Sequence, residues 1–373
     1  MMKNKLLRFA LFAMAALGIP FTVVANDEGK ILMIVSSNGK EAGEVAPGYE
    51  FDEFAKAYLV FKQNGLKVDI ASPAGGTPVA DKYNPEKDFN AEVLANRHIM
   101  AQLTQTIPTS AVNAQDYDAV FVVGGKGAMF DLPDDKALQQ IIAEVWHQNG
   151  VVAAVCHGPA ALVNVTLDDG SYLIANKKIN GFTNQEEQLF GKKWINEFKF
   201  LLEDKFAERG AKFESSPFML SHVAIDQRLI TGQNPASTVA VANKVVEQLG
   251  KTPVQSAPYS DDYTLAIVAD YLSGKEEALD KFKQQPENVQ LEWVGMYGYY
   301  YAEVATTDNQ SKQALELMQV AQPSLKHPML GVKIAQVQHE LGEVNAAIVT
   351  LNTLLKDTPD FQPALDMLKS LSI

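Results

Sequence analysis

A single cysteine, Cys156, stands where a short run of strand-forming residues gives way to a helical segment. Residues 151–155 read Val-Val-Ala-Ala-Val, and His157, Gly158 and Pro159 follow the cysteine. This order predicts a sharp strand-to-helix turn that pushes the cysteine side chain out of the strand end, as the serine nucleophile of α/β hydrolases is presented. The amides and dipole of a helix N-terminus would favour a thiolate over a thiol. The simpler alternative is that Cys156 is a small core residue.

Three further segments carry residues suited to chemistry around a thiol. Residues 47–53 contain Pro-Gly followed by a glutamate, residues 123–131 contain Gly-Gly-x-Gly and then an aspartate, and residues 231–237 read Thr-Gly-Gln-Asn-Pro-Ala-Ser. Glycine lets the backbone approach a substrate closely and adopt positive φ. The backbone amides of Gly125 and His157 are therefore the natural donors to an oxyanion.

Together with residues 155–159, these motifs resemble the ThiJ/PfpI superfamily of class I glutamine-amidotransferase-like domains, and more narrowly its heat-shock chaperone and glyoxalase III branch. The resemblance covers about residues 28–250. It implies a flavodoxin-like, three-layer α/β/α sandwich with a mostly parallel sheet. No cofactor is expected, and no cluster of histidines and acids has the spacing of a metal site.

The resemblance also implies roles for the residues around the cysteine sulfur. Glu53 would point at the sulfur and donate a hydrogen bond or shuttle a proton, with Glu50 as a nearby rival. His157 would act as a base or as an imidazolium partner, which requires an orienting acid. Glu187 fits that position best, and Glu186 is the alternative because a shift of one residue is open.

Lys126 departs from the family pattern. The close relatives usually have histidine between these glycines, whereas this chain has a flexible cation there. We expect Lys126 to lie at the substrate pocket. The departure leaves open which substrate is used and whether activity is retained.

Three functions are compatible with these residues. The first is an exported, cysteine-dependent enzyme that resembles glyoxalase III and converts methylglyoxal-type 2-oxoaldehydes to 2-hydroxy acids without glutathione, or carries out related carbonyl repair. The second is a Cys-His-Glu amidase or peptidase. The third is a non-enzymatic chaperone or thiol sensor.

The order of the remaining segments predicts a doubly wound parallel sheet. Strand patterns at 30–35, 66–71, 117–123, 151–155 and 178–183 alternate with helical patterns at 50–63, 89–106, 134–148 and 186–208. A hairpin is expected around 212–231, and a helix over 236–249 closes this part.

Two domains are expected after a targeting segment. Residues 1–25 read as a signal peptide with a basic start and a short apolar core, so export to the periplasm or medium is predicted. Residues 26–250 form the α/β domain, 251–261 a linker and 262–373 a smaller all-α domain of helical hairpins. One stretch of that domain fits a tetratricopeptide-like register, which suggests a bound protein or peptide.

The composition limits the partners. The net charge of −13 argues against nucleic acid and against an anionic membrane surface. No stretch after the targeting segment is apolar for long enough to span a bilayer. A small reactive carbonyl compound is the expected substrate. The oligomeric state is left open, with a homodimer as one alternative.

Overall fold

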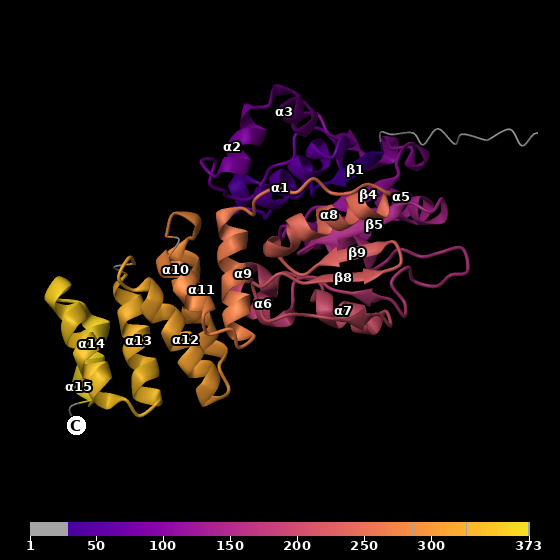
Figure 1. Cartoon of the computed structure of the whole chain (residues 1–373). Helices are drawn as coiled ribbons and strands as arrows, with labels where there is room; N and C mark the ends of the chain where they lie inside the picture. The colour runs from indigo at the N-terminus through magenta and orange to yellow at the C-terminus, as the bar shows by residue number, and fades with distance from the viewer. Residues whose placement is uncertain (1–28, 285, 326, 372–373) are drawn as a thin grey trace, which may run out of the picture.

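The computed structural model describes residues 29–284, 286–325 and 327–371, and the expected signal peptide lies outside them (Figure 1). A seven-stranded sheet with the order β3-β2-β1-β4-β5-β9-β8 forms the centre of the α/β domain, and only β8 runs antiparallel to its neighbour. The predicted, mostly parallel, doubly wound sheet is thus confirmed. Its strands are β1 (Lys30–Ile34), β2 (Lys67–Ser72), β3 (Ile107–Pro108), β4 (Ala119–Val122), β5 (Val151–Val155), β8 (Val223–Asp226) and β9 (Leu229–Gly232).

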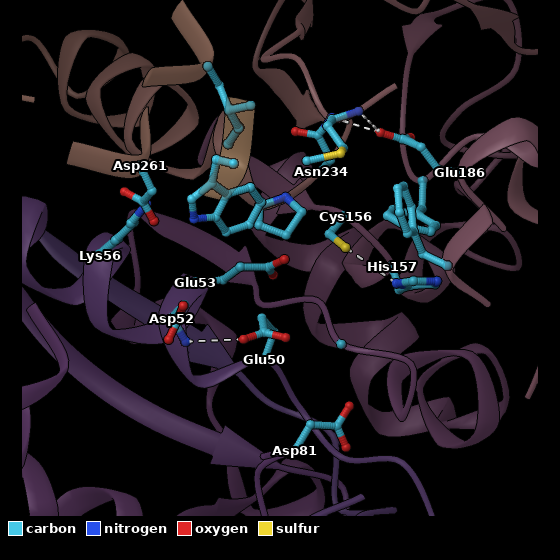
Figure 2. Close-up of a pocket in the computed structure, with 18 of the residues that line it drawn as sticks. Glu50, Asp52, Glu53, Lys56, Asp81, Cys156, His157, Glu186, Asn234 and Asp261 are labelled. Atoms are coloured by element: carbon cyan, nitrogen blue, oxygen red, sulfur yellow. Dashed lines mark hydrogen bonds and ion pairs between the residues drawn. The ribbon is translucent and has the colours of Figure 1, made fainter. Parts of the chain in front are cut away.

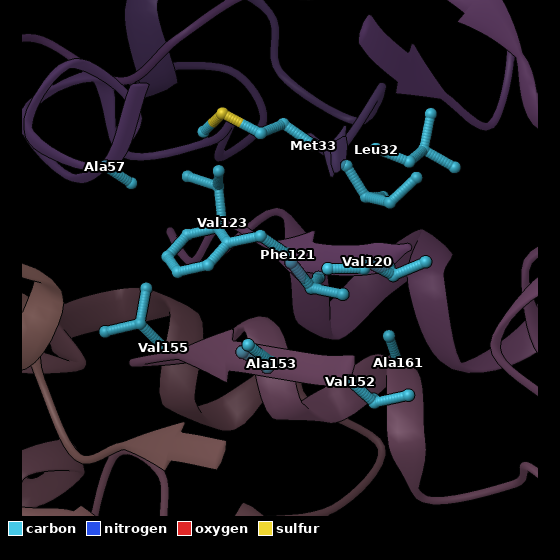
Figure 3. Close-up of a cluster of buried hydrophobic side chains, with 14 of the residues drawn as sticks. Leu32, Met33, Ala57, Val120, Phe121, Val123, Val152, Ala153, Val155 and Ala161 are labelled. Carbon is cyan, nitrogen blue, oxygen red and sulfur yellow. The ribbon is translucent and has the colours of Figure 1, made fainter. Parts of the chain in front are cut away.

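Helices cover both faces of this sheet. They are α1 (Phe51–Gln63), α2 (Asp88–Ala95), α3 (Arg97–Thr104), α4 (Ala128–Asp131), α5 (Lys136–His147), α6 (Asn184–Phe190), α7 (Leu202–Glu208) and α8 (Thr238–Gln248). α1 packs beside α8. Because the crossovers through α1 and α5 are right-handed and lead in opposite directions along the sheet, these two helices lie on opposite faces. Side chains of β1, β4 and β5, Met33, Phe121 and Val155 among them, fill the buried core of the domain (Figure 3).

Four local predictions need correction. The single helix expected at 186–208 is divided into α6, a 3-10 helix, η6 (Lys192–Asn196), and α7. The expected strand at 178–183 is only β6 (Lys178–Ile179), which pairs with β7 (Lys212–Phe213) in a separate two-stranded sheet. The expected helix at 89–106 is broken at Asn96, whose side chain accepts hydrogen bonds from the first amides of α3. The segment after the cysteine is a short 3-10 helix, η5 (Gly158–Leu162), with a proline in its first turn.

The C-terminal region is all-helical, as predicted. It comprises α9 (Ser260–Leu272), α10 (Ala278–Gln284), α11 (Leu291–Val304), α12 (Asp308–Ala321), α13 (Pro328–Glu340), α14 (Val344–Asp357) and α15 (Gln362–Leu371). α11 packs on α12 and α13 on α14. α9 and α10 are separated near Gly274, whose φ is +98°. The last residues of the expected linker already belong to α9. The tetratricopeptide-like register stays a prediction.

A second hydrophobic core, separate from that of the α/β domain, lies between this domain and the helical region. Phe218 and its two following residues are buried against side chains of α9 and α11. The ring of Phe218 stacks on that of Tyr297, with centroids 4.8 Å apart and planes 8° apart. Figure 1 shows α9 next to α6, whose Leu189 and Phe190 pack against this core. No helix among the described residues is both long and apolar enough to cross a membrane.

Candidate active site

The predicted site residues meet at the carboxyl ends of the parallel strands, where open α/β sheets bind ligands. Cys156 follows β5, Gly124 follows β4, and Asn234 follows β9. Glu53 lies in the first turn of α1, which begins after the loop that follows β1. All except Gly124 line one cavity of about 360 Å³ (Figure 2).

Cys156 sits in a strained turn. Its φ is 59°, in the left-handed region that non-glycine residues rarely adopt, and strain of this kind is typical of functional sites. Its amide donates to the Gly232 carbonyl at 2.8 Å, which ties the turn to β9. The residue is only 4% exposed, so the sulfur meets the cavity rather than the outer surface.

The expected thiolate is not supported. Burial, followed by the carboxyl of Glu53, raises the pKa of the Cys156 thiol well above its usual value. The five-residue η5 is also a poor source of a helix dipole, because its few peptide units sum to little charge. Burial, the nearby carboxyl and the short helix therefore all favour the thiol over the thiolate before reaction.

A hydrogen-bonded line leads away from the sulfur. Cys156 Sγ lies 3.3 Å from His157 Nδ1, and His157 Nε2 lies 2.8 Å from Glu187 Oε1. Both partners are buried, and the imidazole packs on the Phe182 ring with centroids 4.4 Å apart. The carboxylate can stabilise an imidazolium, so the line is suited to taking the thiol proton.

The side chain of Glu186, the alternative partner for His157, makes its hydrogen bonds to other groups. It forms a capping box with Thr183 at the start of α6, and its other oxygen accepts hydrogen bonds from the Met219 amide and the Asn234 side chain. Burial raises the pKa of Glu186, although these donors oppose the shift. The structure therefore brings Glu187, and not its neighbour, to the imidazole.

Glu53 lies on the other side of the sulfur. It is fully buried, and its Oε2 accepts a hydrogen bond from the Gly124 amide at 2.7 Å. Oε1 accepts no hydrogen bond from a nitrogen or oxygen of the described residues. Burial first, and the Glu50 carboxyl second, raise the pKa of Glu53 well above its usual value, and a hydrogen bond with Cys156 opposes this. A carboxyl of this kind can hold and return a proton.

Gly124 is what allows the carboxyl and the sulfur to be neighbours. A Cβ on this residue would lie 2.6 Å from Glu53 Oε2 and 2.7 Å from Cys156 Cβ. Gly125 is crowded in the same way by the backbone of residues 48–50, and its φ is +94°. Neither position therefore has room for a side chain, and Gly125, which lines the cavity, brings the backbone close to it.

The rim of the cavity carries charge. Lys126 lines the cavity as expected, and its charge opposes the rise that burial causes in the pKa values of Glu50 and Asp81. Burial outweighs this effect and raises the pKa of Glu50 to about 7. Glu50, the rival of Glu53, is the N-cap of α1, since its side chain accepts from the Asp52 amide.

Sequence reasoning missed two parts of the site. Asp81 comes from the loop after β2 and accepts a hydrogen bond from the Gly48 amide at 2.6 Å, and no pattern pointed to it. A whole wall of the cavity comes from α9 and α11, in the helical region. The described residues contain no group of three or more His, Cys, Asp or Glu side chains arranged to hold a metal ion.

Comparison with protein families matches residues 44–248 to the DJ-1/PfpI family. This chain belongs to that family. The match ends before α9 begins, so the seven helices α9–α15 are an addition to the family domain.

Curated relatives of this family member carry one activity in their names. A glutathione-independent glyoxalase of Schizosaccharomyces pombe, hsp3101, is 31% identical over 244 residues, which cover 60% of this chain and 99% of the relative. The glutathione-independent glyoxalase HSP31 of Saccharomyces cerevisiae is 34% identical over 211 residues, covering 52% of this chain and 85% of the relative.

Solved structures agree on the fold. The crystal structure of glyoxalase III from Candida albicans is 31% identical and superposes with a TM-score of 0.54, covering 59% of this chain and 97% of that one. The 24-kDa rapid encystment protein of Francisella tularensis is 30% identical, with a TM-score of 0.56 and coverage of 59% and 99%.

Proposed function

We propose that this chain is a cysteine-dependent, glutathione-independent glyoxalase that converts methylglyoxal-type 2-oxoaldehydes into 2-hydroxy acids. The observation that carries the proposal is Glu53, a fully buried carboxyl held against the Cys156 thiol on the side opposite His157. A Cys-His-Glu line alone would serve hydrolysis. A second proton carrier beside the sulfur is what the transfer of hydrogen between two substrate carbons requires. The names of the relatives point to the same reaction.

The first step forms a bond between Cys156 Sγ and the aldehyde carbon. The thiol proton passes through His157 Nδ1 to the aldehyde oxygen, which gives a neutral hemithioacetal. Glu187 holds the imidazole and stabilises its protonated form during the transfer. We infer that the amides of Gly125 and His157 bind the oxygen while it is negatively charged.

The second step moves a hydrogen within the substrate. The carboxyl of Glu53, kept protonated by burial, donates its proton to the ketone oxygen and removes the proton from the former aldehyde carbon, which gives an enediol. It then returns that proton to the neighbouring carbon and takes up the proton of the hydroxyl on the former aldehyde carbon, so Glu53 ends as it began. The former aldehyde carbon is thereby oxidised to a thioester, while the ketone carbon is reduced to an alcohol. Water then breaks the carbon–sulfur bond and releases the 2-hydroxy acid and the thiol. The substrate is its own oxidant and reductant, so no further redox partner is needed.

The test is turnover of methylglyoxal without glutathione, followed by loss of the 2-oxoaldehyde and appearance of lactate. Cys156→Ala should abolish turnover. Glu53→Gln should lower kcat by about 10²–10⁴-fold, the usual effect of losing a positioned acid or base. Glu197→Gln, a change at an exposed glutamate, should leave it unchanged. Undiminished turnover in Cys156→Ala would refute the assignment.

Hydrolysis of an amide or peptide is the second candidate, and the hydrogen-bonded line from Cys156 to Glu187 favours it. It requires His157 but assigns no part to Glu53. An acyl-thioester trapped on Cys156 with a glutamine or peptide substrate, together with full activity of Glu53→Gln, would support hydrolysis over the glyoxalase reaction.

A further inference from the structure

The cavity above Cys156 has a wall that the family domain does not supply. Leu265 of α9 and three residues of α11, Trp293, Met296 and Tyr300, line it together with the catalytic residues. All four follow residue 248, where the family match ends. The space available to a substrate is therefore set partly by the added helical region.

α11 presents this wall because of its residue spacing. Positions 293, 296 and 300 are three and four residues apart, so their side chains share one face of the helix. They are half-buried, whereas Val294 and Tyr297, on the adjoining flank of the helix, are fully buried in the core that joins the two regions. The helix thus has one face in the core and one face on the cavity.

Two contacts hold the wall in place. The Tyr300 ring packs edge-on against Phe190, with centroids 5.0 Å apart, and Phe190 ends the same helix that carries Glu187. On the opposite side of the cavity, buried Lys56 donates to Asp261 at 3.0 Å and to Asp262 at 2.8 Å. Lys56 lies three residues after Glu53 on α1, and Figure 2 shows it beside Asp261. The helical wall is therefore anchored next to both proton carriers.

The size and chemistry of the cavity limit the substrate. Its volume of about 360 Å³ falls within the range of roughly 300–1,000 Å³ typical of pockets for drug-sized ligands. A three-carbon aldehyde would leave most of this space to water. The helical wall is apolar and aromatic above the acidic pair that binds Lys56. Both acids and lysines line the rest of the cavity, Asp52 and Lys126 among them, so the preference for an apolar substituent comes from the helical wall.

We propose that the helical region is a substrate-specificity element, and that this enzyme acts on 2-oxoaldehydes bearing a bulky, uncharged apolar or aromatic substituent in preference to methylglyoxal. The aldehyde carbon sits at Cys156, and the substituent lies against Trp293, Met296 and Tyr300. This inference rests on the glyoxalase function proposed above and adds the substrate class. Contact between the substituent and the Trp293 ring should stabilise the transition state for the bulky substrate but not that for methylglyoxal.

The experiment compares kcat/KM for phenylglyoxal and methylglyoxal in the full-length protein. The wild type should favour phenylglyoxal by at least about 10-fold, as expected for filling an apolar pocket. Trp293→Ala should lower kcat/KM for phenylglyoxal by about 10-fold to 100-fold and change that for methylglyoxal by less than about threefold. Met296→Ala should act in the same direction.

Two controls keep the result interpretable. Met329→Ala makes the same methionine-to-alanine change as Met296→Ala, but at an exposed position of α13. It should leave kcat/KM for both substrates unchanged. Trp293→Phe keeps an aromatic ring and should retain most of the preference even if the alanine variant folds poorly. Equal use of both substrates by the wild type, or equal losses in Trp293→Ala, would overturn the specificity proposal while leaving the glyoxalase function standing. Absence of any 2-oxoaldehyde turnover by the wild type would overturn both.

Discussion

The ion pair between α1 and α9 gives a quantitative test of how the two regions are joined. The ammonium group of Lys56 lies within hydrogen-bond distance of both Asp261 and Asp262, and its side chain is only 4% exposed. Lys56→Met keeps most of the side-chain volume but leaves two buried carboxylates without this partner. Removing one partner of a buried pair costs about 3–5 kcal/mol. Lys87, 3.8 Å from Asp261, compensates in part, so we expect about 3 kcal/mol at pH 8.

The pH dependence of this cost has a definite sign. Burial already raises the pKa of Asp262 to about 6, and loss of Lys56 raises it further. A carboxyl with a raised folded-state pKa lowers stability as pH rises through that pKa, and protonation removes the penalty. The effect of Lys56→Met on the free energy of unfolding should therefore be largest at pH 8 and shrink towards pH 4.

Urea unfolding at several pH values, with hydrogen exchange of the α9 amides, measures both effects. Lys62→Met is the matched control on the same helix, because its pairing with Glu92 is exposed and should be worth less than about 1 kcal/mol. If Lys56→Met costs no more than this control at pH 8, or if its cost grows on acidification, the reasoning is wrong.

Two further predictions concern single buried groups. Glu50→Gln removes a carboxyl whose pKa is raised from 4.5 to about 7, so the variant should match the wild type below pH 4.5 and exceed it by about 3 kcal/mol at pH 8 in denaturant titrations; a constant difference across pH would contradict this. Tyr297→Phe removes a buried hydroxyl that has no hydrogen-bond partner among the described residues, keeps the stacking on Phe218, and should stabilise by about 1 kcal/mol. A lower melting temperature would show that the hydroxyl is satisfied.

Much of the catalytic arrangement could be predicted from sequence because it depends on local geometry. The strand-to-turn pattern placed Cys156, and the residue after a nucleophile on such a turn is necessarily close to it. The local sequence also contains the information that distinguishes Glu187 from Glu186 as the partner of His157. Thr183-x-x-Glu186 is a capping-box signature, which assigns the first glutamate to the helix start and leaves the second for His157.

The protonation state of the thiol could not be predicted in this way. The pKa of Cys156 depends on burial and on Glu53, a residue about one hundred positions away that reaches it through the fold. The wall formed by Trp293, Met296 and Tyr300 was missed for a related reason. Their spacing predicts a helical face, but which surface that face covers depends on long-range packing around Phe218 and Lys56.

The shared hydrophobic core between the two regions has a consequence for modularity. A chain shortened to end at Gly250 would contain the whole family match, yet it would expose Phe218, Met219 and Leu220 to water and leave Lys56 without its aspartates. Such a surface favours self-association. We therefore expect the smallest stably folded form of this protein to extend at least through α11, because that helix contributes both to the shared core and to the wall of the cavity.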